Sequence, residues 1–501
     1  MTEFIKITPE DAGVPADAVR RFAEGLESRN INLHSFVMLK DGKLFSEAYY
    51  APWGPDDKHR MYSSSKTFAS MAVGLMIGEG KLSLSDKIVG FFPEYLPAEV
   101  PEYLAMATVR DLLMMATPYQ VNNYGFDDKN WVRTFFDPDS SVSKIRADHR
   151  PGTVFQYNTC ATVVLTAIVE KLSGMRLTEY MKPRVFDRIG MSPDIWCVER
   201  PEGGDWAGSG IMCTPRDLAK FADLILHDGS YCGGQIIPAD YVRAARTKQI
   251  DNRITNSVHD EQFGYGYQIW CTRYGGFALN GMGCQLAIGL PDIGAVLAVT
   301  GDTQASSVGY HEVLNAFWRE IYPYLSSGDT LPPDPDADSR LEACLSERHV
   351  LYTEGEMKSR LASVVDGRRY VFSPNRAGIA EALFSISGEE GAMDYENATG
   401  KHRIRFGFGK NVKGKFPETH YYGRKIGIPA GRGYRIVSSA AWGTESQLLI
   451  TVYSVDDYLG TLRIQASFSD DGSRCTLFMS KAAERFFDEY TGVCEGREKT
   501  L

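Results

Sequence analysis

A polar, acidic and proline-rich segment divides the chain into two regions of different pattern. Residues 326–340 read SSGDTLPPDPDADSR, a composition typical of a linker between folded units. At 501 residues the chain also exceeds the length that one hydrophobic core usually organises. We therefore predict a large first domain over residues 1–328, a linker over residues 329–340 and a second domain over residues 341–501.

The first domain is predicted to build a sheet from both of its ends. Apolar residues at helical spacing predict a helix from Ala16 to Ser28, and Asp41-Gly42 suits a tight hairpin turn between two strand-like segments. The middle of the domain, roughly 63–250, is helical in pattern. The remaining elements are expected as strands at 35–39, 43–50, 264–272, 277–290 and 294–300 and a helix at 310–321. This order predicts an α/β fold of the α+β type, an antiparallel sheet flanked by helices with a helical subdomain.

The second domain is predicted to be rich in β-structure. Its strand-like segments are short and punctuated by Gly, Asp and Asn. They lie at 369–372, 382–386, 402–408, 447–453, 460–468 and 475–479. A helix is expected near the end, from Ala482 to Tyr490. No motif in this domain indicates chemistry, so covering the cleft, dimerisation and separate ligand binding all stay open.

Composition and charge argue against several classes of function. The net charge is -10 and the acidic residues are spread along the chain without a Lys/Arg block, so nucleic acid is not an expected partner. No apolar run approaches ~18 residues and no export signal is recognised at the N-terminus, so no membrane association is expected. The nine cysteines are widely spaced without a C-x-x-C pair. This favours reduced thiols, a cytoplasmic location, and no metal or cofactor.

Ser63 and Lys66 are the first candidates for chemistry. They stand three residues apart in Ser63-Ser64-Ser65-Lys66, so on a helix the hydroxyl and the amine share one face. The apolar stripe that follows predicts a buried helix with Ser63 in its first turn, where the helix N-terminus stabilises negative charge. Burial is expected to lower the lysine pKa and so provide a neutral amine as a base. The pattern alone fits a helix-capping serine beside a surface lysine equally well.

The sequence around these residues resembles a known family. Residues 61–97, MYSSSKTFASMAVGLMIGEGKLSLSDKIVGFFPEYLP, resemble the Ser-x-x-Lys helix region of the serine β-lactamase-like superfamily. These penicillin-recognising serine hydrolases include class C β-lactamases, D-aminopeptidases, DD-peptidases and several esterases and amidases. The resemblance extends over roughly residues 7–325. It implies the β-lactamase/DD-peptidase-like fold and an acyl-enzyme formed on Ser63.

The family's second element, Tyr-x-Asn or Tyr-x-Ser, resembles Tyr157-Asn158-Thr159, which precedes a helix with a buried face. The resemblance implies that Tyr157 shares the proton transfers. A phenol near an ammonium can lose its proton below its free pKa and pass it to a leaving group. Thr159 keeps a hydrogen-bonding side chain but weakens penicillin recognition. The residues alone also fit a core tyrosine, and Cys160 is better explained by packing than as a nucleophile.

The third element, usually Lys-Thr-Gly or His-x-Gly, resembles Leu279-Asn280-Gly281. Leu279 removes the cation that would bind a substrate carboxylate, which favours a neutral acyl substrate. Asn280 fits a polar substrate contact and an edge-strand turn residue equally well. Gly281 permits close backbone approach, and the resemblance implies that the amides of Ser63 and Met282 form an oxyanion hole.

Three other matches are set aside. Ser141 to Lys144 repeats the Ser-x-x-Lys spacing, but it lies in a polar stretch without an apolar helix behind it. Tyr395-Glu396-Asn397 matches the second element literally, but it lies in the second domain among acidic residues. The segments Gly264 to Trp270 and Trp206 to Leu218 resemble family elements whose role is interpreted as structural.

These residues together predict a serine hydrolase that cleaves an ester or amide of a small molecule or short peptide. An esterase or an amidase/peptidase is favoured over an efficient β-lactamase. The alternative, motivated by Leu279 and Thr159, is a catalytically weak family member that acts as a binding or regulatory protein. The choice of Lys66 or Tyr157 as primary base stays open, as does a homo-oligomeric state.

Overall fold

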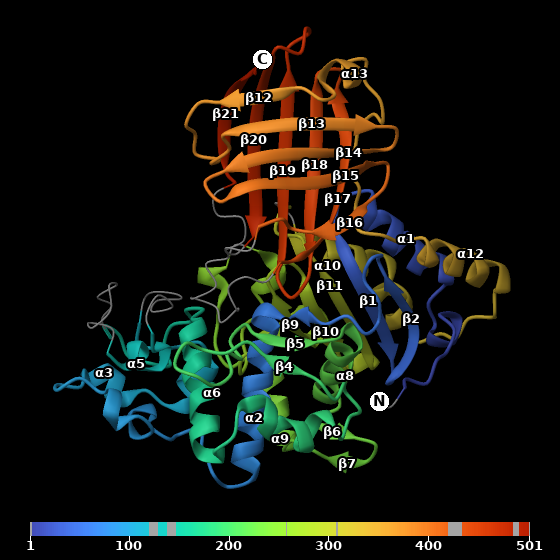
Figure 1. Ribbon diagram of the computed structural model, residues 1–501. Coiled ribbons are helices and arrows are strands. Elements are labelled where there is room, and N and C mark those ends of the chain that lie inside the picture. Colours follow the sequence, from blue (N-terminus) through green and yellow to red (C-terminus); the bar gives the residue numbers. More distant parts are fainter. Residues whose placement is uncertain are drawn as a thin grey trace.

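A six-stranded antiparallel sheet forms the centre of the first domain in the part of the chain that is described (Figure 1). The computed structural model describes residues 3–119, 129–137, 147–256, 258–306, 309–418, 433–483 and 490–499. The strand order is β2-β1-β11-β10-β9-β8. The strands are β1 (Leu33–Lys40), β2 (Lys43–Tyr49), β8 (Trp270–Cys271), β9 (Phe277–Gly281), β10 (Gln285–Leu290) and β11 (Ala295–Gly301). Strand β1 pairs with β11, with Met38 opposite Leu297, so the two ends of the domain meet in one sheet.

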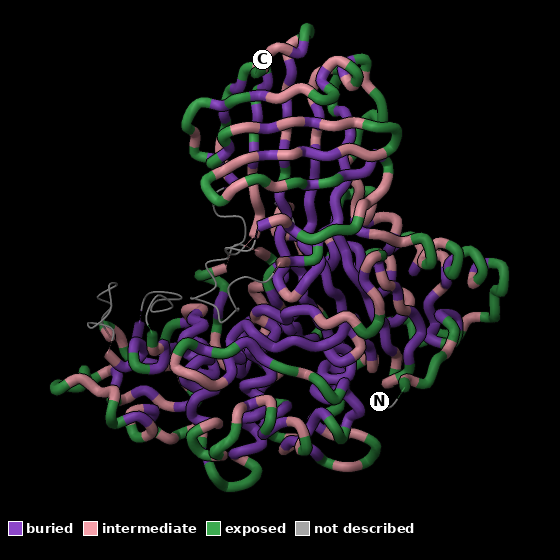
Figure 2. Tube along the Cα trace, viewed as in Figure 1, coloured by how far each residue is buried: buried purple, intermediate pink, exposed green. Residues whose placement is uncertain are grey.

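Helices cover both faces of this sheet. Helices α1 (Ala16–Glu27) and α10 (Gly309–Glu320) pack on one face, where Phe22, Phe36 and Phe317 share a core. Helices α2 (Ser65–Gly78) and α8 (Pro215–Leu226) pack on the other, where Phe68 stacks on Phe221. Figure 2 shows that the buried parts of the trace are concentrated along the sheet and these helices. Alternating strand residues supply apolar side chains to both faces, so the sheet forms the middle layer.

A helical subdomain lies beside the sheet and is inserted between β2 and β8. Its central helix, α6 (Thr159–Ser173), packs against α2 and is buried along most of its length. The other helices are α3 (Glu102–Met106), α4 (Val109–Leu113), α5 (Trp131–Phe136), α7 (Leu177–Met181) and α9 (Ala239–Arg246). The short strands are β3 (His59–Arg60), β4 (Trp196–Cys197), β5 (Ile211–Cys213), β6 (Ser230–Tyr231) and β7 (Gly234–Gln235). This confirms the predicted α+β class with a helical insertion.

The second domain is a sheet that curls onto itself, ten-stranded as far as it is described. The order is β15-β14-β13-β12-β21-β20-β19-β18-β17-β16, and an additional pairing of β15 with β17 closes it. The strands are β12 (Arg369–Phe372), β13 (Glu381–Ser387), β14 (Glu390–Asn397), β15 (Gly400–Phe408), β16 (Val412–Lys415), β17 (Arg435–Thr444), β18 (Gln447–Val455), β19 (Leu459–Phe468), β20 (Arg474–Ala483) and β21 (Gly492–Glu498). Helix α13 (Ala362–Val365) precedes them. The β-rich prediction is confirmed.

The terminal helix expected from Ala482 to Tyr490 is not found where it can be checked. Residues 482 and 483 belong to β20, where Ala482 pairs with Thr461, and Tyr490 lies outside any helix. Residues 484–489 lie outside the described residues. Cross-strand pairing overrides the helical preference of Lys481-Ala482-Ala483.

The segment between the two domains is partly helical. Helix α11 (Tyr322–Ser327) precedes it, and α12 (Pro335–Ser346) packs against α1 with Ala337 and Leu341 buried. Asp334 caps α12 by accepting a hydrogen bond from the Ala337 amide at 2.9 Å. Half of the segment 329–340 therefore docks on the first domain. The boundary proposed between residues 340 and 341 falls inside α12, and the one between residues 328 and 329 follows the end of α11.

Candidate active site

Ser63 lies in a tight turn that leads directly into a buried helix. Strand β3 is followed by a 3-10 turn over Tyr62–Ser64 and then by α2. Tyr62 has φ 44°, an unusual left-handed conformation for a bulky side chain. The Ser64 hydroxyl donates to the Gln285 carbonyl at 2.5 Å, and the Ser65 hydroxyl accepts from the Ile211 amide at 3.1 Å. These contacts leave Ser63 partly exposed at the start of α2.

The structure brings Ser63, Lys66 and Tyr157 together. Lys66 Nζ lies 3.1 Å from Ser63 Oγ and 5.0 Å from the centre of the Tyr157 ring. The Tyr157 hydroxyl is within hydrogen-bonding reach of Ser63. Lys66 is 1% exposed, so the alternative of a surface lysine is wrong. A nucleophile with two proton-handling neighbours is an arrangement suited to acyl transfer.

Aromatic side chains fix the Tyr157 ring. It stacks on Trp270 with ring centres 5.6 Å apart and meets Tyr265 edge-on at 6.4 Å. Burial and the nearby Glu261 carboxylate raise the Tyr157 pKa, and the hydrogen bond with Ser63 only partly offsets them. The expectation that an ammonium lowers this pKa is therefore wrong, because desolvation of the phenolate is the larger effect. Tyr157 keeps its proton at neutral pH.

A backbone carbonyl holds the other side of Lys66. The amine donates to Gly208 O at 2.7 Å, in the turn between β4 and β5. Arg60 fixes the same turn by donating to Ser209 O at 2.8 Å and Ser209 Oγ at 2.9 Å. A Cβ on Gly208 would lie 2.8 Å from Thr159 Cγ2, so the turn has no room for a side chain. The segment from Trp206 to Leu218, which the sequence analysis interpreted as structural, thus contacts Lys66 directly.

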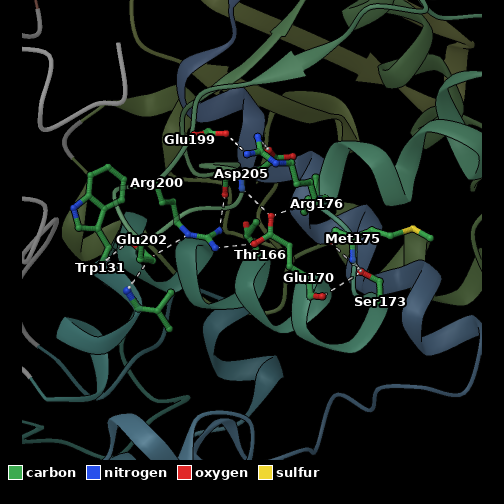
Figure 3. A network of polar contacts seen from close by, with 12 residues as sticks. Trp131, Thr166, Glu170, Ser173, Met175, Arg176, Glu199, Arg200, Glu202 and Asp205 are labelled. Carbon is green, nitrogen blue, oxygen red and sulfur yellow. Dashed lines mark hydrogen bonds and ion pairs between the residues drawn. The ribbon is translucent and has the colours of Figure 1, made fainter. Parts of the chain in front are cut away.

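An ionic network supports the chain just before this turn (Figure 3). Arg200, 6% exposed, donates to Glu170 at 2.7 Å, to Glu202 at 3.1 Å and to the Asp205 carbonyl at 2.7 Å. Glu170 in turn accepts from the Asp205 amide at 2.7 Å. Arg176 pairs with Glu199 at the rim of the network. The network ties residues 199–205 to α6, the helix that follows Tyr157, and so couples the two sides of the site.

The turn after β9 lies beside Ser63. A Cβ on Gly281 would lie 2.2 Å from the Met61 carbonyl oxygen, so glycine is required for this close approach. Met282 is 38% exposed, and its amide donates to no acceptor among the described residues. The Ser63 amide is one of those that the start of a helix leaves without an intrahelical partner. The sequence and the packing agree on two amides available for an oxyanion, and the oxyanion hole stays a prediction.

The other predicted residues lie around this centre. Thr159 is buried at the start of α6 against Gly208, and Leu279 is buried in the core of the first domain. Asn280 donates to Glu261 Oε1 at 3.4 Å. Cys160 is buried and its pKa is raised by desolvation, so it is unsuited to act as a thiolate.

Of the two motif matches set aside above, one lies in the second domain and the other lies outside the described residues. Tyr395 lies in β14 of the second domain, where its hydroxyl donates to Glu418 at 2.7 Å. The segment from Ser141 to Lys144 lies outside the described residues.

The second domain reaches the residues next to Ser63. Leu459, at the start of β19, shares a small core with Tyr62, and its amide donates to the Tyr62 hydroxyl at 3.5 Å. The Arg60 guanidinium lies 4.5 Å from the ring centre of Tyr62, 4.6 Å from that of Tyr458 and 4.8 Å from that of Trp206. Figure 1 shows the tip of the β18–β19 hairpin directed at the first domain. The sequence did not predict this contact, because the aromatic residues that form it belong to no recognised motif.

Some residues of the site were missed by sequence analysis. They are Gly208, Trp270, Gln285 and Glu261. Gly208 and Gln285 act through backbone atoms, which side-chain motifs do not reveal. Trp270 and Glu261 come from segments without catalytic spacing, and only the fold brings them beside Tyr157.

The fold defines a serine hydrolase of the β-lactamase-like class. A model of the beta-lactamase family matches residues 18–314, more than half of the chain. The chain belongs to the beta-lactamase family.

Known proteins similar to this chain support that assignment. The 6-aminohexanoate-dimer hydrolase of Paenarthrobacter ureafaciens is 26% identical over 286 residues, which cover 53% of this chain and 71% of that protein. A solved structure of a candidate 6-aminohexanoate-dimer hydrolase from Bacillus anthracis superposes with a TM-score of 0.52 at 20% identity, covering 66% of this chain and 89% of that one. At this identity the solved structure bears on the fold alone. In the described part of the chain, no helix has the length and apolarity needed to cross a membrane.

Proposed function

We propose that this protein hydrolyses an ester or amide bond through an acyl-enzyme on Ser63. The observation that carries the proposal is the convergence of the Ser63 hydroxyl, the Lys66 amine at 3.1 Å and the Tyr157 phenol in one site. Ser63 Oγ attacks the substrate carbonyl and its proton moves to the neutral Lys66 amine. The new alkoxide receives hydrogen bonds from the Ser63 and Met282 amides. Collapse of this intermediate expels the leaving group.

Lys66 and Tyr157 divide the proton transfers in this proposal. The raised pKa of Tyr157 supports a phenol that donates its proton to the leaving group. The phenol then regains a proton from the Lys66 ammonium, 5.0 Å from its ring centre. In the second half of the reaction water attacks the acyl carbonyl as the neutral Lys66 amine takes its proton, and Lys66 then returns that proton to Ser63 Oγ as the acid product leaves. We therefore propose Lys66 as the primary base, one of the two candidates that the sequence left open.

The substrate is proposed to be a small ester or amide or a short peptide, with no carboxylate beside Asn280. Leu279 is buried and apolar where the family resemblance implies a cation, so a carboxylate there would find no partner from this residue. Gly281 lets the substrate approach the backbone closely, and Asn280 offers the substrate a polar contact. Thr159 supports the Gly208 turn. The similarity to a 6-aminohexanoate-dimer hydrolase favours an amidase or esterase over an efficient β-lactamase.

The cellular compartment and the partners of the protein are also proposals. All nine cysteines are free thiols, and seven of them are buried, which favours a reducing, cytoplasmic compartment. We propose a small molecule as the only partner needed for the reaction. A homo-oligomer fits the proposal but is not required by it.

A substrate screen tests this function. Short-chain p-nitrophenyl esters, D-amino-acid amides and a chromogenic cephalosporin are offered to the wild type and to the Ser63→Ala variant. We expect turnover of an ester or amide that S63A loses, with the cephalosporin turned over slowest. Turnover that persists in S63A rejects Ser63 as the nucleophile. A wild type that neither turns over substrate nor is labelled by a fluorophosphonate supports the binding-protein alternative.

A further inference from the structure

The Glu261 carboxylate lies beside Asn280, next to the turn that approaches Ser63. Glu261 ends a short 3-10 turn, His259–Glu261, and its Oε1 accepts hydrogen bonds from Asn280 at 3.4 Å and from the Tyr310 hydroxyl. Asn280 precedes Gly281 and Met282, the turn beside Ser63. The same carboxylate is close enough to Tyr157 to raise the pKa of its phenol. Glu261 therefore belongs to the Asn280 end of the site.

The charge of Glu261 is not balanced by the protein. The preceding residue differs in this respect, because Asp260 pairs with Arg273 at 2.5 Å and 3.0 Å. Glu261 makes no ion pair with a described residue, and its Oε2 accepts no hydrogen bond from one. Both donors to Oε1 are neutral groups. The side chain is partly exposed, so Oε2 is available to a ligand.

The backbone of Glu261 is held in place. Asn252, which is fully buried, donates to the Glu261 carbonyl at 2.7 Å and accepts from the Gly264 amide at 2.9 Å. Tyr310 reaches the carboxylate from α10. The carboxylate is thus fixed from both sides before any ligand arrives, as expected of a preorganised binding group.

We infer that Glu261 binds a cationic amine of the substrate, so that the preferred substrates are esters or amides that carry an ammonium group. This inference rests on the proposed function of the Ser63 site and adds the substrate class. Leu279 leaves this end of the cleft without a cation of its own, and Glu261 makes it negative. A partly desolvated carboxylate with one free oxygen forms a strong charge-assisted hydrogen bond with an ammonium.

Matched substrates test the inference. One pair is the 6-aminohexanoyl and heptanoyl derivatives, which differ only in an ammonium or methyl end group, and the other is the D-alanyl and isobutyryl derivatives. Each is prepared with the leaving group that the wild type turns over. We expect kcat/KM to favour the ammonium member of at least one pair by roughly 10- to 100-fold. In Glu261→Gln, which keeps an acceptor for Tyr310 and Asn280, this preference should fall to about 1.

A charge-matched variant separates a local effect from a change in net charge. Glu312→Gln removes the same charge from α10, where Glu312 pairs with Arg29 at 3.3 Å on the surface, and the ammonium preference should persist. A preference that survives in E261Q, or no preference in the wild type, overturns the inference.

A binding measurement keeps the inference testable if Ser63 proves inactive. Hexylamine and 1-hexanol are compared by their effect on the midpoint of thermal unfolding of the wild type and E261Q. We expect hexylamine to raise the midpoint of the wild type more than 1-hexanol does, and this difference to vanish in E261Q. Equal shifts in the wild type reject the ammonium site, whereas absent turnover with an intact amine effect rejects only the proposed function.

Discussion

Lys66 Nζ donates to Ser63 Oγ at 3.1 Å and to the Gly208 carbonyl at 2.7 Å, so one buried amine joins Ser63 to the turn that contains Gly208. The two acceptors come from segments about 145 residues apart in the chain. Because the amine is held from both sides, its position depends on the Gly208 turn as much as on its own helix. The first two predictions follow from this geometry.

Removing either proton-handling group should slow the chemical step. We expect Lys66→Ala and Tyr157→Phe each to lower kcat at least ~100-fold, the usual scale for lost acid-base catalysis. Tyr157→Phe keeps the ring that stacks on Trp270, so its fold should be preserved. Steady-state kinetics measure the effect, with Lys171→Ala, an exposed lysine paired with Glu94, as the control. Near-normal turnover in either variant would remove that residue from the mechanism.

The Gly208 turn should tolerate no side chain. In Gly208→Ala the new Cβ would meet Thr159 Cγ2 at 2.8 Å, which displaces the carbonyl that holds Lys66. We expect kcat to fall about 10- to 100-fold and the protein to lose about 1–3 kcal/mol of stability from overpacking.

Thr159→Ser removes that methyl group and provides the matched test. The loss caused by Gly208→Ala should be smaller in the T159S background than in the wild-type background, because the contact with Cγ2 is gone. Kinetics and thermal unfolding of the four proteins measure the coupling. Equal losses in both backgrounds would show that the contact does not position Lys66.

The Tyr458 ring of the second domain should stabilise Arg60, which lies just before Ser63 in the chain. Tyr458 lies 4.6 Å from the Arg60 guanidinium, which is fully buried. We expect Tyr458→Ala to destabilise the protein by about 1–2 kcal/mol through the lost cation–π contact, while Tyr458→Phe stays close to the wild type. Chemical unfolding measures both. Equal stability of the Ala and Phe variants would mean that the ring does not stabilise Arg60.

Two buried histidines should make the fold sensitive to acid. His59 Nε2 lies 3.2 Å from His34 Nδ1, and both rings are fully buried. Burial lowers the His59 pKa to about 3. Between about pH 3 and the unfolded value near 6.5 the unfolded chain binds a proton that the folded protein excludes. The free energy of unfolding should therefore fall as the pH drops from 6.5 towards 3.

An uncharged replacement tests this assignment. In His59→Asn the unfolding midpoint should change less between pH 7 and pH 4.5 than it does in the wild type. His259→Asn, at an exposed position, serves as the control and should retain the wild-type dependence. The same pH dependence in H59N as in the wild type would place the acid sensitivity elsewhere.

The sequence pattern predicted several of the longer helices and strands correctly. The helix expected at Ala16 to Ser28 is α1, and the hairpin around Asp41-Gly42 is β1 and β2. By contrast, the single strand expected at 277–290 is split into β9 and β10 by a turn at Met282-Gly283-Cys284. Gly283 and Cys284 both have positive φ there, and an apolar run does not reveal such a turn. Strands β14, β17 and β21 also escaped prediction, because they contain Gly, Ala or acidic residues of low β-propensity.

The part of the candidate site that depends on the spacing of side chains along one helix could be predicted from the sequence. Ser63 and Lys66 share a helix face, so their contact follows from three residues of separation. Tyr157 required the family resemblance, since nothing local ties it to Ser63. The raised pKa of Tyr157 depends on its burial and on Glu261, 104 positions away in the chain. Only the folded structure brings these two residues together.

Covalent labelling shows directly whether Ser63 is the nucleophile. The protein is treated with a fluorophosphonate probe, and the labelled residue is identified by peptide mass spectrometry in the wild type, S63A and Ser141→Ala. We expect one label on the Ser63 peptide, complete loss of labelling in S63A and full labelling in S141A. Labelling that persists in S63A, or that maps to Ser141, would contradict it.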